Sequence, residues 1–217
     1  IKMTGSFPTR LTELSQAKPE KITIFFQESG TDDYLISYQD LINRSTNYAA
    51  KLIESNVKPG DVVVLLFNHT PDLIYAFWGA IILGAIPSIL PFLTEKLNPE
   101  RYQADLESLI SITKPTAIIT YPDFKEIVQK VAGAGTSVKT ILFADQISQN
   151  EISDITNFPG FLRDPKDIVL LQHSSGTTGL QKGVALSHQA VFNQLRALRE
   201  MSQVRSEEDV IVSWLPL

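Results

Sequence analysis

Short apolar runs alternate with amphipathic segments along most of the chain, and this alternation restricts the fold more than any other feature. The clearest run, residues 62–67, is continuous and rich in β-branched side chains, which is typical of a strand covered on both faces. Further short strands are predicted at residues 86–90, 116–120, 138–143, 168–171 and 184–186. Helices are predicted at residues 37–55, 71–83, 99–112 and 123–132, and again from Ser187. The pattern predicts an α/β fold, a mostly parallel sheet with flanking crossover helices.

A polar segment, residues 145–167, breaks the alternation and contains two proline-marked turns, at Pro159 and Pro165. We therefore expect an α/β subdomain at residues 1–144, a connecting loop at 145–167 and a second unit at 168–217. The chain stops inside an apolar run that has no strand or helix terminator. The 217 residues are accordingly expected to be a piece of a longer chain.

Composition excludes several classes of function. Nineteen basic residues against twenty-four acidic ones give a net charge of −5, so no general basic field is available for nucleic acid, and no nucleic-acid partner is expected. The chain has no cysteine, which excludes disulfide frameworks, thiolate zinc sites and a cysteine nucleophile. With no secretory signal in the first residues, we expect a soluble, cytoplasmic protein.

Residues 73–93 carry no charge and are long enough to cross a bilayer. Two glycines and two prolines divide this run, however, at Gly79, Gly84, Pro87 and Pro91. Thr70 and Pro71 form a helix start ahead of it, and Gly84 can end that helix. We therefore predict a buried helix followed by a short strand, and no membrane span.

The chemistry is concentrated directly after the predicted strand at residues 168–171. Ten residues, 174–183, contain four hydroxyl side chains, three glycines and a lysine. Glycines let backbone N–H groups turn toward a ligand, hydroxyls add donors, and a lysine supplies a point charge for phosphate oxygens. This composition predicts a polyphosphate site; the plain alternative is a flexible connection with an incidental lysine.

The spacing does not match a Walker-type loop. That loop needs glycine before the lysine and a hydroxyl residue after it, at the start of a helix. Here Gln181 precedes Lys182, Gly183 follows it, and the next residues are apolar and β-branched. We therefore expect the stretch to join two strands, which disfavours an NTP hydrolase or kinase of the P-loop type.

Residues 171–188, LQHSSGTTGLQKGVALSH, closely resemble the phosphate-binding signature of the adenylate-forming, or AMP-binding, superfamily. This superfamily includes acyl-CoA synthetases, fatty acyl-AMP ligases, luciferases and the adenylation domains of nonribosomal peptide synthetases. Weaker similarity extends over residues 36–41, 58–61, 67–85 and 214–217. One departure is Gln181, where many members have proline, so the stretch is expected to be less rigid than theirs.

The resemblance implies an acid–thiol ligase. Members activate a carboxylic acid with ATP and Mg²⁺, release pyrophosphate, and pass the acyl group to CoA or to the phosphopantetheine of a carrier protein, including carriers of peptide and polyketide synthases. By resemblance, the ATP phosphates would be held by Ser174, Ser175, Gly176, Thr177, Thr178, Gly179, Lys182 and Gly183. Thr177 is the hydroxyl expected to reach Mg²⁺.

Three other polar residues are weaker candidates. His173 either contacts the adenylate or the substrate, or is a neutral histidine satisfied within the protein. His188 is expected to bond backbone as a helix cap, and Asn68 either faces a ligand at a strand end or forms a turn. Trp78 is expected in the core.

Two further interpretations stay open. In the superfamily the acyl pocket, a metal-binding glutamate and a lysine on a mobile domain all lie further along the chain. The 217 residues alone are therefore expected to be inactive. The alternative is a nucleotide-binding module without catalysis, and less favoured is an NTP hydrolase. The sequence does not identify the acid or choose between CoA and a carrier protein.

Overall fold

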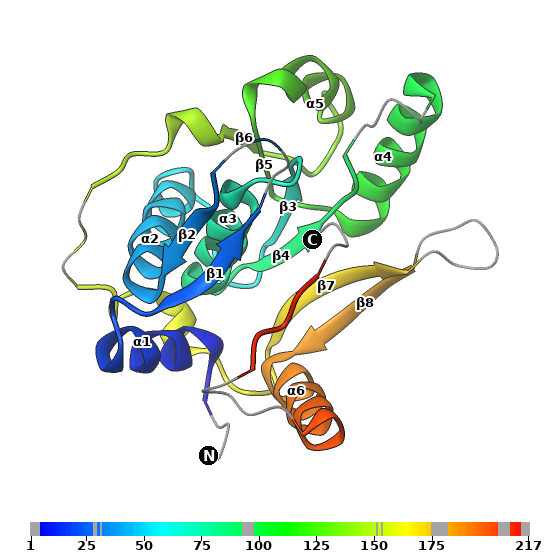
Figure 1. The fold of residues 1–217 in the computed structure, drawn as a ribbon. Coiled ribbons are helices and arrows are strands. Elements are labelled where there is room, and N and C mark those ends of the chain that lie inside the picture. The colour runs from blue at the N-terminus through cyan, green and yellow to red at the C-terminus, as the bar shows by residue number, and fades with distance from the viewer. Residues whose placement is uncertain are drawn as a thin grey trace.

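The computed structural model describes residues 5–27, 30, 32–92, 98–150, 152, 154–174, 182–203 and 209–213. Its centre is a four-stranded parallel sheet in the order β4-β3-β5-β6 (Figure 1). The strands are β3 (Val62–Leu66), β4 (Ile86–Ile89), β5 (Ala117–Thr120) and β6 (Thr140–Phe143). The predicted α/β class and the parallel sheet are confirmed.

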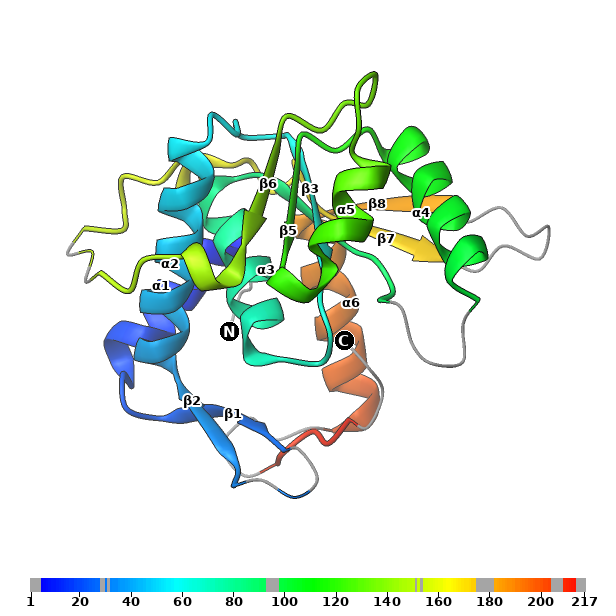
Figure 2. The same ribbon diagram turned by 90° about the horizontal axis from the view of Figure 1, so that it is seen from above.

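Two pairs of helices cover the two faces of this sheet, as Figure 2 shows. Alternate side chains of each strand point to opposite faces. Val63 and Leu65 of β3 therefore pack with α2 (Tyr38–Glu54) and α3 (Pro71–Leu83). Val64 and Leu66 pack on the other face with α4 (Pro99–Thr113) and α5 (Lys125–Val131). Burial on both faces explains why residues 62–67 read as a continuous apolar run.

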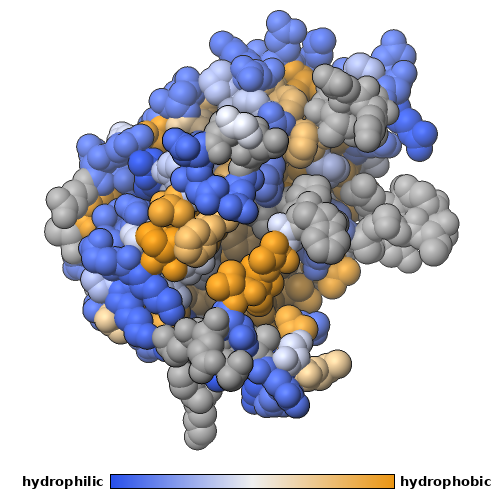
Figure 3. Space-filling model, in the orientation of Figure 1, coloured by the Kyte–Doolittle hydropathy of each residue, from blue (hydrophilic) through white to orange (hydrophobic). Residues whose placement is uncertain are grey.

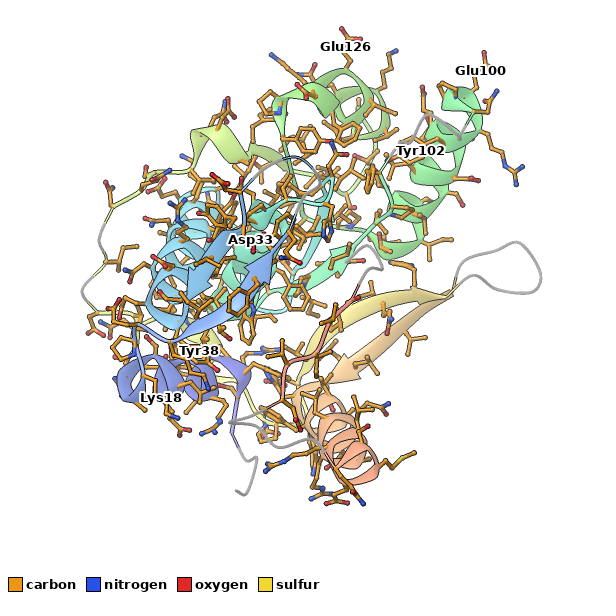
Figure 4. All side chains as sticks on the ribbon, viewed as in Figure 1. Lys18, Asp33, Tyr38, Glu100, Tyr102 and Glu126 are labelled. Atoms are coloured by element: carbon orange, nitrogen blue, oxygen red, sulfur yellow. The ribbon has the colours of Figure 1, made fainter. Side chains whose placement is uncertain are left out.

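Charged and aromatic side chains divide between the outside and the inside of this layered structure. Tyr102 points inward from α4, and its hydroxyl donates a hydrogen bond to the carbonyl of Pro91 at 2.8 Å (Figure 4). Burial raises the pKa of this hydroxyl well above its usual value. Glu100 and Glu126 project outward from α4 and α5 (Figure 4).

Local sequence signals set the helix ends. Ser37 and Asp40 form a reciprocal capping box at the start of α2, with the Ser37 side chain accepting from the Asp40 N–H and the Asp40 side chain accepting from the Ser37 N–H. Helix α3 starts with Pro71 and ends at Gly84, whose φ of 85° is the left-handed conformation that favours glycine. Thr70 occupies the cap position but makes no side-chain cap bond, so only part of the predicted helix start is confirmed.

No helix or strand is predicted from the sequence before residue 37. The structure has a helix there, α1 (Phe7–Ala17), and an antiparallel pair of strands, β1 (Ile22–Phe26) and β2 (Tyr34–Ser37). Two predicted elements are also shorter than expected. The strand predicted at residues 138–143 begins at Thr140, and the helix predicted at 123–132 is a 3₁₀ turn (Pro122–Phe124) followed by α5.

Residues 145–167 lead from β6 to the last part of the chain and include short 3₁₀ turns at Ala144–Gln146 and Pro159–Leu162. The second turn packs directly on the carboxyl end of α3. A β-carbon added at Gly160 would collide with the carbonyl oxygens of Ile81 and Ile82. The backbones meet so closely that only glycine fits at this position.

The last part of the described chain is an antiparallel hairpin followed by a helix. The strands are β7 (Ile168–Ser174) and β8 (Lys182–Ser187), and the helix is α6 (His188–Ser202). Strand β7 lies beside β4, at the edge of the parallel sheet (Figure 1). Within the described ranges no helix is both long and apolar enough to cross a membrane.

Candidate nucleotide site

The β7–β8 hairpin brings the two ends of the predicted phosphate-binding stretch together. Its register sets Ser174 opposite Lys182 and His173 opposite Gly183. Strand β7 runs three residues beyond the predicted end, and β8 begins two residues before the predicted start. Ser174 and Lys182 therefore belong to paired strands, whereas both were expected within the connection between them.

Five of the eight predicted phosphate ligands lie outside the described residues: Ser175, Gly176, Thr177, Thr178 and Gly179. The side chains of Ser174 and Lys182 also lie outside them. The described backbone does test whether the stretch leads into a helix, as a Walker-type loop would. Lys182 opens a strand, and the next helix begins only at His188, so the stretch connects strand to strand as predicted.

His173 is a polar side chain of the hairpin that contacts the parallel sheet. Its Nε2 lies 2.9 Å from the Oγ of Ser88 on β4, which joins the hairpin to the edge of the parallel sheet across 85 positions of sequence. Ser88 is fully buried. Burial lowers the pKa of His173 below its usual 6.5, so the ring is neutral at pH 7.

The other ring nitrogen of His173, Nδ1, is buried and has no hydrogen-bond partner among the described residues. Leaving a buried polar group unpaired costs about 1–3 kcal/mol, so such an atom in a native structure requires an explanation. Sequence reasoning left open whether His173 is satisfied within the protein. Within the part of the chain that is described, Nε2 of His173 has a hydrogen-bond partner and Nδ1 has none.

Gly183 leaves room for the side chain of Leu171. A β-carbon at Gly183 would lie 3.1 Å from Cδ1 of Leu171 and 3.8 Å from Cε1 of His173. The side chains of Leu171 and His173 lie on the same face of β7, because alternate residues of a strand share a face. Glycine at this position is thus explained by packing as well as by the phosphate role expected of it.

Asn68 follows β3 at the carboxyl edge of the sheet, where open α/β sheets bind ligands. It lies beside Tyr121, the residue after β5. Burial raises the pKa of the Tyr121 hydroxyl to about 12, and hydrogen bonding from Asn68 partly offsets this effect. Asn68 therefore has a partner within the protein, as expected of a structural residue.

His188 is buried at the start of α6, with 2% of its surface exposed. The expectation that it caps the helix is wrong, because the side chain of Ser187 accepts the capping bond from the Ala190 N–H. His188 does bond backbone, but 181 positions away: its Nδ1 accepts a hydrogen bond from the N–H of Phe7 at 3.2 Å. The contact ties α6 to the start of α1.

An aromatic cluster surrounds this contact. The ring of Phe7 stacks on that of Phe192, with ring centres 4.3 Å apart, and meets Trp78 edge-on at 6.1 Å. Trp78 is partly exposed and packs at the margin of the core, rather than inside it.

We predict that acid destabilises the fold partly through His188. Burial and, secondarily, the Arg163 guanidinium lower its pKa, while Asp167 opposes the shift. The unfolded chain then binds this proton at a higher pH than the folded chain does, so stability is fully present above pH 6.5 and falls as the pH drops below it. An H188N variant keeps an acceptor for Phe7 but does not titrate. Its urea midpoint should fall less than that of the unmodified protein between pH 7 and about 5. Parallel curves would contradict this assignment.

Two cavities lined by described residues lie away from the hairpin. One, of about 640 Å³, opens at the amino ends of β5 and β6 and is lined by residues of α4, α5 and the turn at 133–137. Another, of about 460 Å³, lies between β1 and residues 210–213. Figure 3 shows apolar side chains gathered around it. In the described ranges, no group of three or more His, Asp or Glu side chains could hold a metal ion.

Comparisons with known proteins agree on one family. The family model described as "AMP-binding enzyme" matches residues 11–217. Among curated proteins, the chain is 29% identical over 200 residues to "4-coumarate--CoA ligase CCL1" of Humulus lupulus. The matched region covers 87% of this chain and 35% of that protein. The chain therefore spans about a third of the length of this relative.

Solved structures share the fold. A fatty acyl-adenylate ligase from L. pneumophila, solved with acyl adenylate and pyrophosphate, matches with a TM-score of 0.78 and 23% identity, over 97% of this chain and 35% of that one. The adenylation domain of a keto acid-selecting NRPS module, bound to keto acyl adenylate, matches with a TM-score of 0.80 and 18% identity, over 99% of this chain and 37% of that one.

Proposed function

Because the chain belongs to the AMP-binding enzyme family, we propose that it takes part in the ATP-dependent activation of a carboxylic acid as an acyl adenylate. The similar proteins include a CoA ligase and enzymes solved with acyl adenylates. The names of these proteins specify different acids, and only the first names CoA. The adenylate is the shared chemistry, and it is the step we assign to the site on the β7–β8 hairpin.

The register of the hairpin is the structural observation that supports this assignment. It sets Ser174 opposite Lys182, so the stretch between them starts and ends at one point of the fold. We propose that ATP phosphates bind there to Ser174, Ser175, Gly176, Thr177, Thr178, Gly179, Lys182 and Gly183. The buried, unpaired Nδ1 of His173 one residue away fits a site that is completed by a ligand.

The reaction needs charge neutralisation more than covalent help. A carboxylate oxygen of the acid attacks the α-phosphorus, and the bond from that phosphorus to the oxygen bridging to the β-phosphate breaks. The bond electrons leave with pyrophosphate, so negative charge grows on the leaving group. Lys182 would offset this charge, and backbone and hydroxyl donors would orient the phosphates. Mg²⁺, when bound, would neutralise phosphate charge further. Thr177 offers the hard hydroxyl oxygen that this ion accepts.

The acyl acceptor is proposed to be a thiol outside these 217 residues, which contain no cysteine. The thioester would form on CoA or on the phosphopantetheine of a carrier protein. We also propose that the chain forms the amino-terminal portion of the large domain. Most of its length aligns with about a third of the length of each of these relatives. On this proposal residues 1–144 form the α/β subdomain, 145–167 connect, and 168–217 carry the phosphate site.

ATP–pyrophosphate exchange by the complete protein tests the proposal. A panel of fatty, aromatic, keto and amino acids should contain at least one that stimulates incorporation of labelled pyrophosphate into ATP. The isolated 217 residues should show no exchange. ATP binding without exchange for any acid would instead favour a nucleotide-binding module, and phosphate release without acid would favour a hydrolase.

A further inference from the structure

The hydrogen atoms of the Ser88–His173 pair can be assigned from the partners available to them. Ser88 is fully buried, and in the described part of the chain its hydroxyl has one hydrogen-bond partner, Nε2 of His173. A serine hydroxyl carries one hydrogen to donate, and a buried hydrogen of this kind is nearly always used. Ser88 therefore donates and Nε2 accepts.

This direction fixes the tautomer of the ring. A neutral imidazole carries one N–H, and a nitrogen that accepts a hydrogen bond cannot carry it. The N–H of His173 is consequently on Nδ1, the atom that is buried with no partner in the described residues. The protein thus holds a rigid N–H donor, with no described acceptor, one residue before Ser174.

We propose that His173 is a ligand-binding residue whose Nδ1–H donates to a phosphate oxygen of the bound nucleotide, and that Ser88 is the positioning residue that keeps the proton on Nδ1. The inference rests on the proposed function, since it assigns the nucleotide to this hairpin. Phosphate oxygens are acceptors only, so they match an N–H and could not pair with a bare Nδ1.

The alternative to ligand binding is a purely structural role, in which His173 only holds β7 against β4 through Ser88. Two amide variants separate the two roles. Asn places its side-chain amide near the position of Nδ1, whereas Gln places it near Nε2. His173→Asn would keep a donor for the ligand and lose the contact with Ser88, and His173→Gln would do the reverse.

The test measures binding of ATP, AMP and pyrophosphate, each as a separate probe, to the complete protein by titration calorimetry. We expect His173→Gln to weaken ATP binding about tenfold, because it removes a hydrogen bond to a charged acceptor. His173→Asn should stay within about threefold of the unmodified protein. Weaker binding of AMP by His173→Gln would place the contact at the α-phosphate. Weaker binding of pyrophosphate would place it at the β- or γ-phosphate.

The reverse ranking, with His173→Gln unchanged and His173→Asn impaired, would overturn the proposal in favour of the structural tie. Equal affinities for all three proteins would also overturn it. If the unmodified protein binds no ATP, the proposed function itself fails, which is a different result. Unfolding temperatures of both variants show whether a weak binder is simply misfolded.

The tautomer can be observed without any ligand. In protein labelled with ¹⁵N-histidine, His173 should show a protonated Nδ1 and an unprotonated Nε2, and its assignment is made by loss of the signals in His173→Asn. Ser88→Ala removes the hydroxyl that selects this tautomer, so the Nδ1 signal should move toward the unprotonated range, with ATP binding weakened about threefold. An Nε2-protonated ring in the unmodified protein would contradict the assignment.

Discussion

Replacing Lys182 by Ala should lower ATP–pyrophosphate exchange by the complete protein about 10²- to 10³-fold, the usual effect of removing one preorganised group that stabilises transition-state charge. Lys182 opens β8, and its backbone is held opposite Ser174 by the hairpin register. On the proposed function, its charge offsets the negative charge that grows on pyrophosphate as the bond to the α-phosphorus breaks.

The matched control is Lys125→Ala. Lys125 is an exposed lysine at the start of α5, the helix that precedes β6, whereas the hairpin lies beside β4 at the opposite edge of the sheet. The control removes the same charge from the chain and should leave exchange unchanged. If both variants kept full exchange with the same acid, Lys182 would not hold the phosphates. If both lost it equally, the effect would come from overall charge.

Replacing Gly160 by Ala should destabilise the fold by about 3 kcal/mol, at the upper end of the usual cost of overpacking. The added β-carbon would collide with two backbone carbonyls of α3, from Ile81 and Ile82. Side chains can rotate away from a clash, but these carbonyls are fixed by the helix. The turn at Pro159–Leu162 would have to move off the end of α3.

Urea unfolding of the complete protein measures this loss, and Gly133→Ala is its control. A β-carbon at Gly133 would lie 3.4 Å from the carbonyl oxygen of Lys130, which is an ordinary contact. The control should unfold within about 0.5 kcal/mol of the unmodified protein, as surface substitutions usually do. A Gly160 variant of equal stability would show that the turn can shift at little cost.

The sequence was informative where one local signal decides the structure. Residues 62–67 predicted a doubly covered strand, and β3 is buried on both faces. Pro71 and Gly84 predicted the two ends of α3, and the left-handed φ of Gly84 confirms the second. Such features depend on a few neighbouring residues, so no knowledge of the rest of the fold is needed.

The amino-terminal elements lacked such signals. Helix α1 has only three buried residues, Pro8, Leu11 and Ser15, and of these only Leu11 is a large apolar residue. Strands β1 and β2 are short, and only three of their nine residues are buried. Their stability comes from packing on other parts of the chain, which a local pattern does not record.

Pairings between distant residues were out of reach for the same reason. The sequence singled out His173 and His188, yet neither Ser88 nor Phe7 carried any mark of its role as their partner. A serine in a short apolar strand is one faint signal. Ser88 is the polar side chain within Ile86–Ile89, and a hydroxyl buried in a strand requires a partner somewhere.

The contact between β4 and β7 also has a consequence for the order of folding. Pairing of Ser174 with Lys182 closes a connection of only seven residues, whereas the Ser88–His173 contact closes one of 85 positions. Chain entropy makes the second closure costlier by about 2 kcal/mol. The hairpin should therefore form on its own in microseconds and dock onto β4 late, after the parallel sheet exists. Variants at Ser88 would then speed unfolding and leave the folding rate nearly unchanged.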